Sequence, residues 1–114
     1  MPLKTFAQVQ QFIDQVLTQN SEIDGVSAAP HGSFWTALSY QEFTTGNVPG
    51  VSPATPILIV GDSKNSNIIQ ALLGVGPLFG PNGAIGQMPG NGPPFFTQDQ
   101  IQEFADWIDA GCPQ

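Results

Sequence analysis

The chain has 114 residues, with nine acidic residues, two lysines and no arginine, and its net charge is −7. This length suits one compact domain, residues 1–114, and is too short for two. The acidic balance argues against nucleic-acid binding and against attachment to an anionic membrane, because both need clustered Lys and Arg. No apolar run is long enough to span a membrane, and the N-terminus lacks a signal-peptide pattern. We therefore expect a cytoplasmic protein, unless the chain is a processed or recombinant product.

The first half of the chain predicts two helices. Over residues 6–19, apolar side chains recur on one helical face after the capping residue Thr5. A shorter helix is predicted over 40–45, with Ser39 and Glu42 at capping-box spacing and Gly46 as a left-handed terminal residue. Residues 47–56, which contain three prolines and one glycine, predict a loop. The apolar residues 57–60 predict a buried extended segment.

A third helix is predicted over residues 64–73, capped by Asp62 or Ser63 and ended by Gly74. We expect its buried face to hold Ile68, Ile69, Leu72 and Leu73. Glycine and proline then dominate residues 74–94, which predict a long loop of the kind that often carries function.

The last helix is predicted over residues 98–110, with Thr97 and Gln100 as its capping box. We expect Ile101, Phe104, Ala105 and Ile108 to point inward. Acidic residues at spacings of four, three and three share one face of this helix: Asp99, Glu103, Asp106 and Asp109. Two of them lie near the helix C-terminus, where the macrodipole disfavours anions. The face is either a surface for a basic protein partner or a device for solubility.

Short motifs stand in a fixed order between these helices: His-Gly at 31–32, Met-Pro at 88–89 and Trp-Ile-Asp-Ala-Gly at 107–111. Over residues 23–113 this order resembles the small bacterial class I cytochrome c domains. The resemblance implies an all-α, cytochrome c-like fold of four short helices, in which the first and last helices cross to form the main core. It also implies that His31 and Met88 hold the positions of the two axial haem ligands.

The chain departs from this family at the haem-attachment motif, which in the family reads Cys-x-x-Cys-His. Residues 27–31 read Ser-Ala-Ala-Pro-His, so Ser27 and Pro30 replace both cysteines and thioether bonds to haem cannot form. An empty pocket of haem size would cost on the order of ten kcal/mol. Either haem is bound without covalent bonds, or side chains occupy its space. Six residues are candidates to fill or to line that space: Phe34, Trp35, Leu78, Phe79, Phe95 and Phe96.

Haem propionates need hydrogen-bond donors or cations. The available donors are Trp35, Trp107 and Tyr40, and the cations are Lys4 and Lys64 alone. We therefore expect a cytochrome c-fold protein with no cofactor, acting as a small acidic binding or accessory module with a basic protein partner. The alternative is an electron-transfer protein that binds haem non-covalently through His31 and Met88.

Catalytic and metal sites other than haem find little support in the sequence. A nucleophilic pair of Cys112 and His31 is unfavourable, because a thiol that follows a helix C-terminus has a raised pKa. A copper site would require Met88 to converge with these two residues. We therefore expect no enzyme activity and no metal beyond a possible haem iron.

Overall fold

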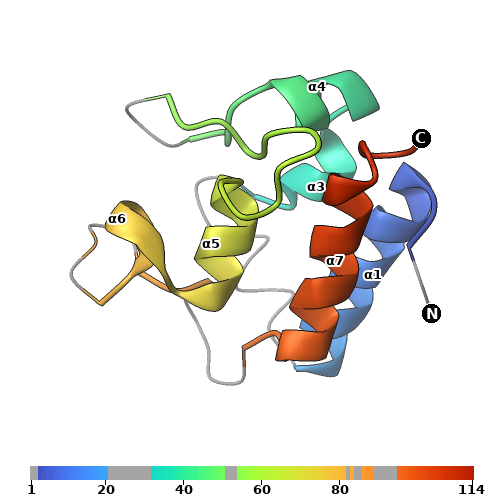
Figure 1. Ribbon diagram of the computed structural model, residues 1–114. Coiled ribbons are helices and arrows are strands. Elements are labelled where there is room, and N and C mark those ends of the chain that lie inside the picture. Colours follow the sequence, from blue (N-terminus) through green and yellow to red (C-terminus); the bar gives the residue numbers. More distant parts are fainter. Residues whose placement is uncertain (1–2, 21–31, 51–53, 82, 84–85, 89–94) are drawn as a thin grey trace.

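The computed structural model describes residues 3–20, 32–50, 54–81, 83, 86–88 and 95–114, and this part of the chain is mainly helical. Its helices, which Figure 1 shows, are α1 (Phe6–Gln19), α3 (Phe34–Ala37), α4 (Tyr40–Thr45), α5 (Asn67–Leu73), α6 (Gly76–Phe79) and α7 (Gln98–Asp109). The only extended pairing among the described residues is an isolated antiparallel bridge between Asn47 and Pro56. No helix in this part of the chain combines the length and the apolar character that crossing a membrane requires. The all-α expectation is confirmed at this level.

The predicted capping residues begin three of the helices. The Thr5 side chain accepts the backbone N–H of Gln8 at 3.2 Å, so α1 begins where the periodicity predicts. Both α4 and α7 carry complete capping boxes, formed by Ser39 with Glu42 and by Thr97 with Gln100. Because each box satisfies backbone donors at the first turn, these helix starts are encoded locally.

The start of the third predicted helix is wrong by three residues, since α5 begins at Asn67. Asp62 accepts the backbone N–H of Asn65 at 3.3 Å, so the residues expected to open the helix form a turn instead. Gly74 ends α5 in the left-handed region with φ 70°, as predicted. Leu73 is 39% exposed rather than buried, and Ala71 takes its place in the core.

Three further expectations need correction. Gly46 ends α4 with φ −95° and ψ −171°, which is extended and not left-handed. The apolar run 57–60 is buried only at Ile57 and Leu58, because the chain then turns outward. The predicted loop 74–94 contains the short helix α6, in which Pro77 occupies the first turn, where a missing N–H is tolerated.

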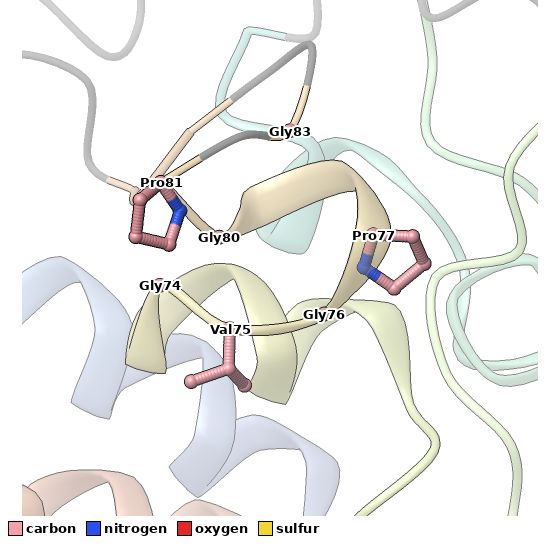
Figure 2. Close-up of a pocket in the computed structure, with 7 residues that line it drawn as sticks. All are labelled: Gly74, Val75, Gly76, Pro77, Gly80, Pro81 and Gly83. Atoms are coloured by element: carbon pink, nitrogen blue, oxygen red, sulfur yellow. The ribbon is translucent and has the colours of Figure 1, made fainter.

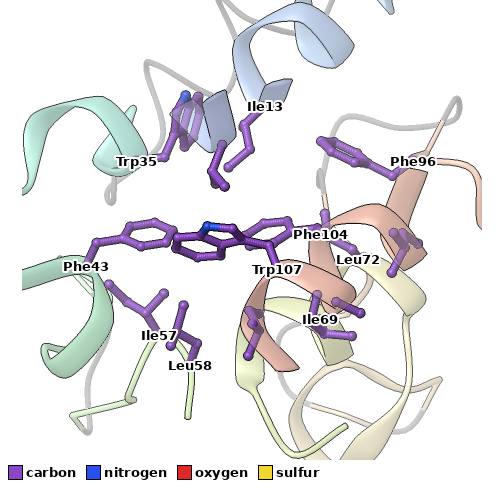
Figure 3. Packing of buried hydrophobic residues seen from close by; sticks show 14 of the residues in the cluster. Ile13, Trp35, Phe43, Ile57, Leu58, Ile69, Leu72, Phe96, Phe104 and Trp107 are labelled. Carbon is purple, nitrogen blue, oxygen red and sulfur yellow. The ribbon is translucent and has the colours of Figure 1, made fainter. Parts of the chain in front are cut away.

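The core joins the two ends of the chain. In Figure 1, α1 and α7 lie side by side. The ring of Phe6 in α1 stacks at 6.5 Å on Trp107 of α7 and lies 5.3 Å from Phe43 of α4. Figure 3 shows Phe43, Trp107 and Phe104 in one aromatic row, with Ile57 and Leu58 against it. Buried aromatic rings of this kind remove about 150–250 Å² each from water, so this row contributes much of the stability.

Candidate functional site

The axial-ligand positions are described only in part. His31, Ser27 and Pro30 lie outside the described residues. Met88 is half-buried, and its backbone N–H donates to the carbonyl of Ala71 at 2.8 Å. The side chain of the neighbouring Gln87 donates to the carbonyl of Leu72 at 3.1 Å. These two bonds fix the Met88 segment against the end of α5.

Phe34 and Trp35, the residues that follow the His-Gly pair, lie in α3 and are buried in the core. Their rings meet edge to face at 5.5 Å, and Phe34 also stacks on Phe43 at 6.1 Å. Gln10 of α1 donates its side-chain amide to the carbonyl of Trp35 at 2.9 Å. The two side chains therefore fill space between α1, α3 and α4.

The other four candidate pocket residues divide between two places. Phe96 is buried in the core beside α7 and meets Phe12 of α1 edge to face at 6.2 Å, while Phe95 is half-buried. On α6, Phe79 is buried and Leu78 is half-buried. The structure thus brings Phe34, Trp35 and Phe96 into the main core with α1. It places Leu78 and Phe79 on α6.

Hydrogen bonds within the chain already engage the three expected propionate donors. The indole N–H of Trp35 donates to the Asp14 carboxylate at 2.6 Å, and that of Trp107 donates to the carbonyl of Pro113 at 3.0 Å. The Tyr40 hydroxyl donates to the carbonyl of Cys112. A propionate at any of these donors would have to displace an existing acceptor, so this donor set does not fit haem.

The acidic face of α7 is only partly free. Asp99 and Asp106 are exposed, although Asp106 accepts the side-chain amide of Gln102 at 2.8 Å, and Glu103 is half-buried. Asp109 accepts both the backbone N–H and the hydroxyl of Ser63, each at 2.8 Å. These two bonds offset the unfavourable macrodipole at this end of α7, which is about 0.3–1 kcal/mol for an anion. Asp109 therefore has a structural role that the helical pattern alone did not reveal.

Beside Asp109 the chain makes an exposed turn, Ile59–Asp62, which the sequence pattern did not predict. The N–H of Asp62 donates to the carbonyl of Ile59 at 3.0 Å, and Gly61 takes φ 84°, which favours glycine. The N–H of Gly61 donates to the carbonyl of Ile108 in α7 at 3.0 Å. Ile59 and Val60 are each 47% exposed. The Gly-Asp pair after an apolar run was the available signal for this turn.

A shallow pocket of about 330 Å³ lies between the end of α5 and α6 (Figure 2). Its lining consists of glycine, proline and valine residues: Gly74, Val75, Gly76, Pro77, Gly80, Pro81 and Gly83. It shares no residue with the six candidate haem-pocket residues and has no charged lining. Leu78 and Phe79 lie on α6 between the lining residues Pro77 and Gly80 but are not part of the lining.

Cys112, the cysteine of the unfavoured catalytic pair, is fully buried. Burial raises the pKa of its thiol to about 11, so the thiol is protonated near neutral pH. The pKa direction agrees with the prediction, but the cause is desolvation rather than the helix macrodipole. Within the described ranges, no group of three His, Cys, Asp or Glu side chains is arranged to hold a metal ion.

Comparisons with family models, with curated proteins and with solved structures find no match for this chain. The sites described here consequently stand on their own geometry: the engaged donors around the core, the acidic face of α7 and the exposed turn beside it.

Proposed function

We propose that this protein is a haem-free member of the cytochrome c-like folds and acts as a small acidic binding module for a basic protein partner. The observation that carries the proposal is the bonding of Trp35, Trp107 and Tyr40 to acceptors within the chain. Haem propionates need hydrogen-bond donors or cations, and the three donors predicted for them here are bonded within the polypeptide itself.

The order and contacts of the helices support the fold in this proposal. A long first helix, the short helices α3 and α4, then α5, a segment that holds α6 and Met88, and a final helix follow one another. This order resembles that of the class I cytochrome c domains. The first and last helices meet through Phe6 and Trp107. Phe34, Trp35 and Phe96 are buried in the core, which agrees with the proposal that side chains take the place of a cofactor.

Charge supports the choice of partner. The chain has a net charge of −7, and α7 has no basic residue in its last turn to balance its carboxylates. A surface with this potential attracts cationic proteins and accelerates their encounter. Solubility alone is the competing explanation, and a binding measurement separates the two.

Titration with haemin tests the haem-free part of the proposal. We expect no Soret band characteristic of ligated haem, and the same result for the wild type and for Met88→Ala. A red complex whose spectrum changes in Met88→Ala and in His31→Ala would overturn the proposal. It would instead establish the alternative, a non-covalent haem protein for electron transfer.

Calorimetric titration with an oligolysine peptide tests the binding part. We expect an affinity that falls steeply with salt and that falls further in the double variant Asp99→Asn, Asp106→Asn. Glu42→Gln removes a carboxylate from α4 and serves as the charge control. Binding that ignores salt, or an equal loss per charge in the control, would contradict a specific acidic face on α7.

A further inference from the structure

The turn Ile59–Asp62 is held from both sides by hydrogen bonds. Ser66, whose side chain is fully buried, accepts the N–H of Ile59 at 2.8 Å and donates to the carbonyl of Asp62 at 2.8 Å. On the opposite side, Gly61 donates to the carbonyl of Ile108, and Ser63 donates twice to Asp109. The turn is therefore fixed against the C-terminal end of α7, beside which this segment passes in Figure 1.

This fixed turn presents apolar side chains to solvent. Ile59 and Val60 are each 47% exposed, although the two residues before them, Ile57 and Leu58, are buried. Both side chains are β-branched and have few rotamers, and their backbone is already ordered. A partner that covers them gains the burial of apolar surface while little conformational entropy is lost on this side of the interface.

The surroundings of the turn carry negative charge. Asp62 belongs to the turn, Asp109 is bonded to the residue that follows it, and Asp106 lies one helical turn before Asp109 on α7. Lys64 is exposed on the same segment, and the three carboxylates outnumber it. The carbonyl end of α7 adds further negative potential. An apolar contact framed by anions matches a ligand that combines aliphatic side chains with lysine or arginine.

We propose that the turn Ile59–Asp62 and the adjoining end of α7 form the docking site for the basic partner, with Ile59 and Val60 as its apolar anchor. The occupant is a peptide segment that alternates aliphatic and basic side chains. This inference rests on the proposed function and deepens it: the acidic face attracts the partner, and the turn decides where it binds.

Two synthetic peptides of equal charge test the proposal, acetyl-Leu-Lys-Leu-Arg-Leu-Lys-amide and its counterpart with serine in place of leucine. In titrations followed by ¹⁵N–¹H NMR, we expect the leucine peptide to bind more tightly. Its chemical-shift changes should centre on residues 59–63 and on the end of α7. The double variant Ile59→Ser, Val60→Ser should lower the affinity for the leucine peptide about tenfold and leave the affinity for the serine peptide unchanged.

The double variant Leu73→Ser, Val75→Ser is the matched control, because these two aliphatic residues are 39% and 46% exposed at the other end of α5. It should leave both affinities unchanged, and circular dichroism checks that both double variants are folded. The proposed docking site is wrong if both peptides bind but Ile59→Ser, Val60→Ser does not change their affinities. It is also wrong if the chemical-shift changes centre on residues 74–83. In both cases the proposed function as an acidic binding module is unaffected. If neither peptide binds, both the docking site and the proposed function are wrong.

Discussion

At the scale of single residues, side-chain hydrogen bonds join segments that are far apart in the sequence. Trp35 in α3 bonds to Asp14 in α1, Ser63 bonds to Asp109 in α7, and Tyr40 bonds to the carbonyl of Cys112. None of these pairs follows from helical periodicity, because each joins positions that only the tertiary fold brings together. They explain why polar residues stand at the edges of an aromatic core.

Trp35→Phe should lower the free energy of unfolding by about 1–3 kcal/mol, because the Asp14 carboxylate then loses a charge-assisted donor at a half-buried site. Urea denaturation of Trp35→Phe, Asp14→Ala and the double variant measures the coupling between the two side chains. We expect a coupling of at least about 0.5 kcal/mol. Additive effects of the two substitutions would show that the bond contributes nothing to stability.

Cys112 should resist thiol reagents in the native state. With a pKa of about 11, only about one thiol in a thousand is ionised at pH 8, and the side chain is fully buried. Ellman's reagent should therefore react with it only as fast as the protein opens, and rapidly in guanidinium chloride. Prompt labelling of the native protein would contradict this burial.

The same thiol predicts a loss of stability in alkali. The pKa of this thiol in the folded state lies above the ordinary value of 9.0, because burial disfavours the thiolate. The contribution of the protonated thiol to the free energy of unfolding is therefore complete below pH 9.0 and is lost as pH rises through about 11. Thermal melts across this range should show a smaller alkaline decrease for Cys112→Ala than for the wild type.

At the scale of secondary-structure elements, the sequence predicted what is encoded locally. The starts of α1, α4 and α7 follow from Thr5, Ser39 with Glu42, and Thr97 with Gln100, because capping is a contact between near neighbours. The start of α5 did not follow, since Ser66 bonds back to Ile59 and Asp62 instead of capping the helix. These bonds of Ser66 depend on the turn before α5, and hydrogen bonds to α7 hold that turn in place.

The candidate site shows the same division between local and tertiary information. The acidic spacing along α7 was readable, because it follows from helical geometry alone. Asp109 as the partner of Ser63, and the outward turn at Ile59 and Val60, were not readable, because both require α7 to lie beside residues 59–63. Of the six residues predicted to fill or line a haem-sized space, the structure places Phe34, Trp35 and Phe96 in the core.

The capping box of α4 predicts a dependence of stability on acid. The N–H of Ser39 donates to the Glu42 carboxylate, and this bond, helped by the Ser39 side chain, lowers the pKa of Glu42 below its ordinary value of 4.5. Its contribution to stability is therefore complete above pH 4.5 and is lost as pH falls through the lowered folded-state pKa. Glu42→Gln keeps an acceptor in the box, so its thermal midpoint should fall less than that of the wild type between about pH 6 and pH 3. If the thermal midpoints of the two proteins fall equally with pH, the Glu42 carboxylate does not contribute to stability in this way.

At the scale of the whole molecule, charge opposes compaction. A net charge of −7 is held on a molecule with a radius of gyration of 12.8 Å. In about 0.01 M salt the screening length is about 30 Å, so the carboxylates repel one another across the whole protein. Sodium chloride at about 0.5 M should therefore raise the thermal midpoint. Asp99→Asn with Asp106→Asn, which removes two of the carboxylates, should show a smaller rise, and an equal rise would point to a general salting-out effect instead.

The position of α7 in the core also bears on how the protein is made. Phe104, Trp107 and Ile108 are among its most deeply buried side chains, and Phe6 near the start of the chain packs directly on one of them. In a growing chain on the ribosome, Phe6 of α1 consequently lacks its contact with Trp107 until α7 has emerged. A chain that ends before Thr97 lacks these buried side chains and leaves apolar side chains of its remaining core uncovered, which favours aggregation and recognition by chaperones.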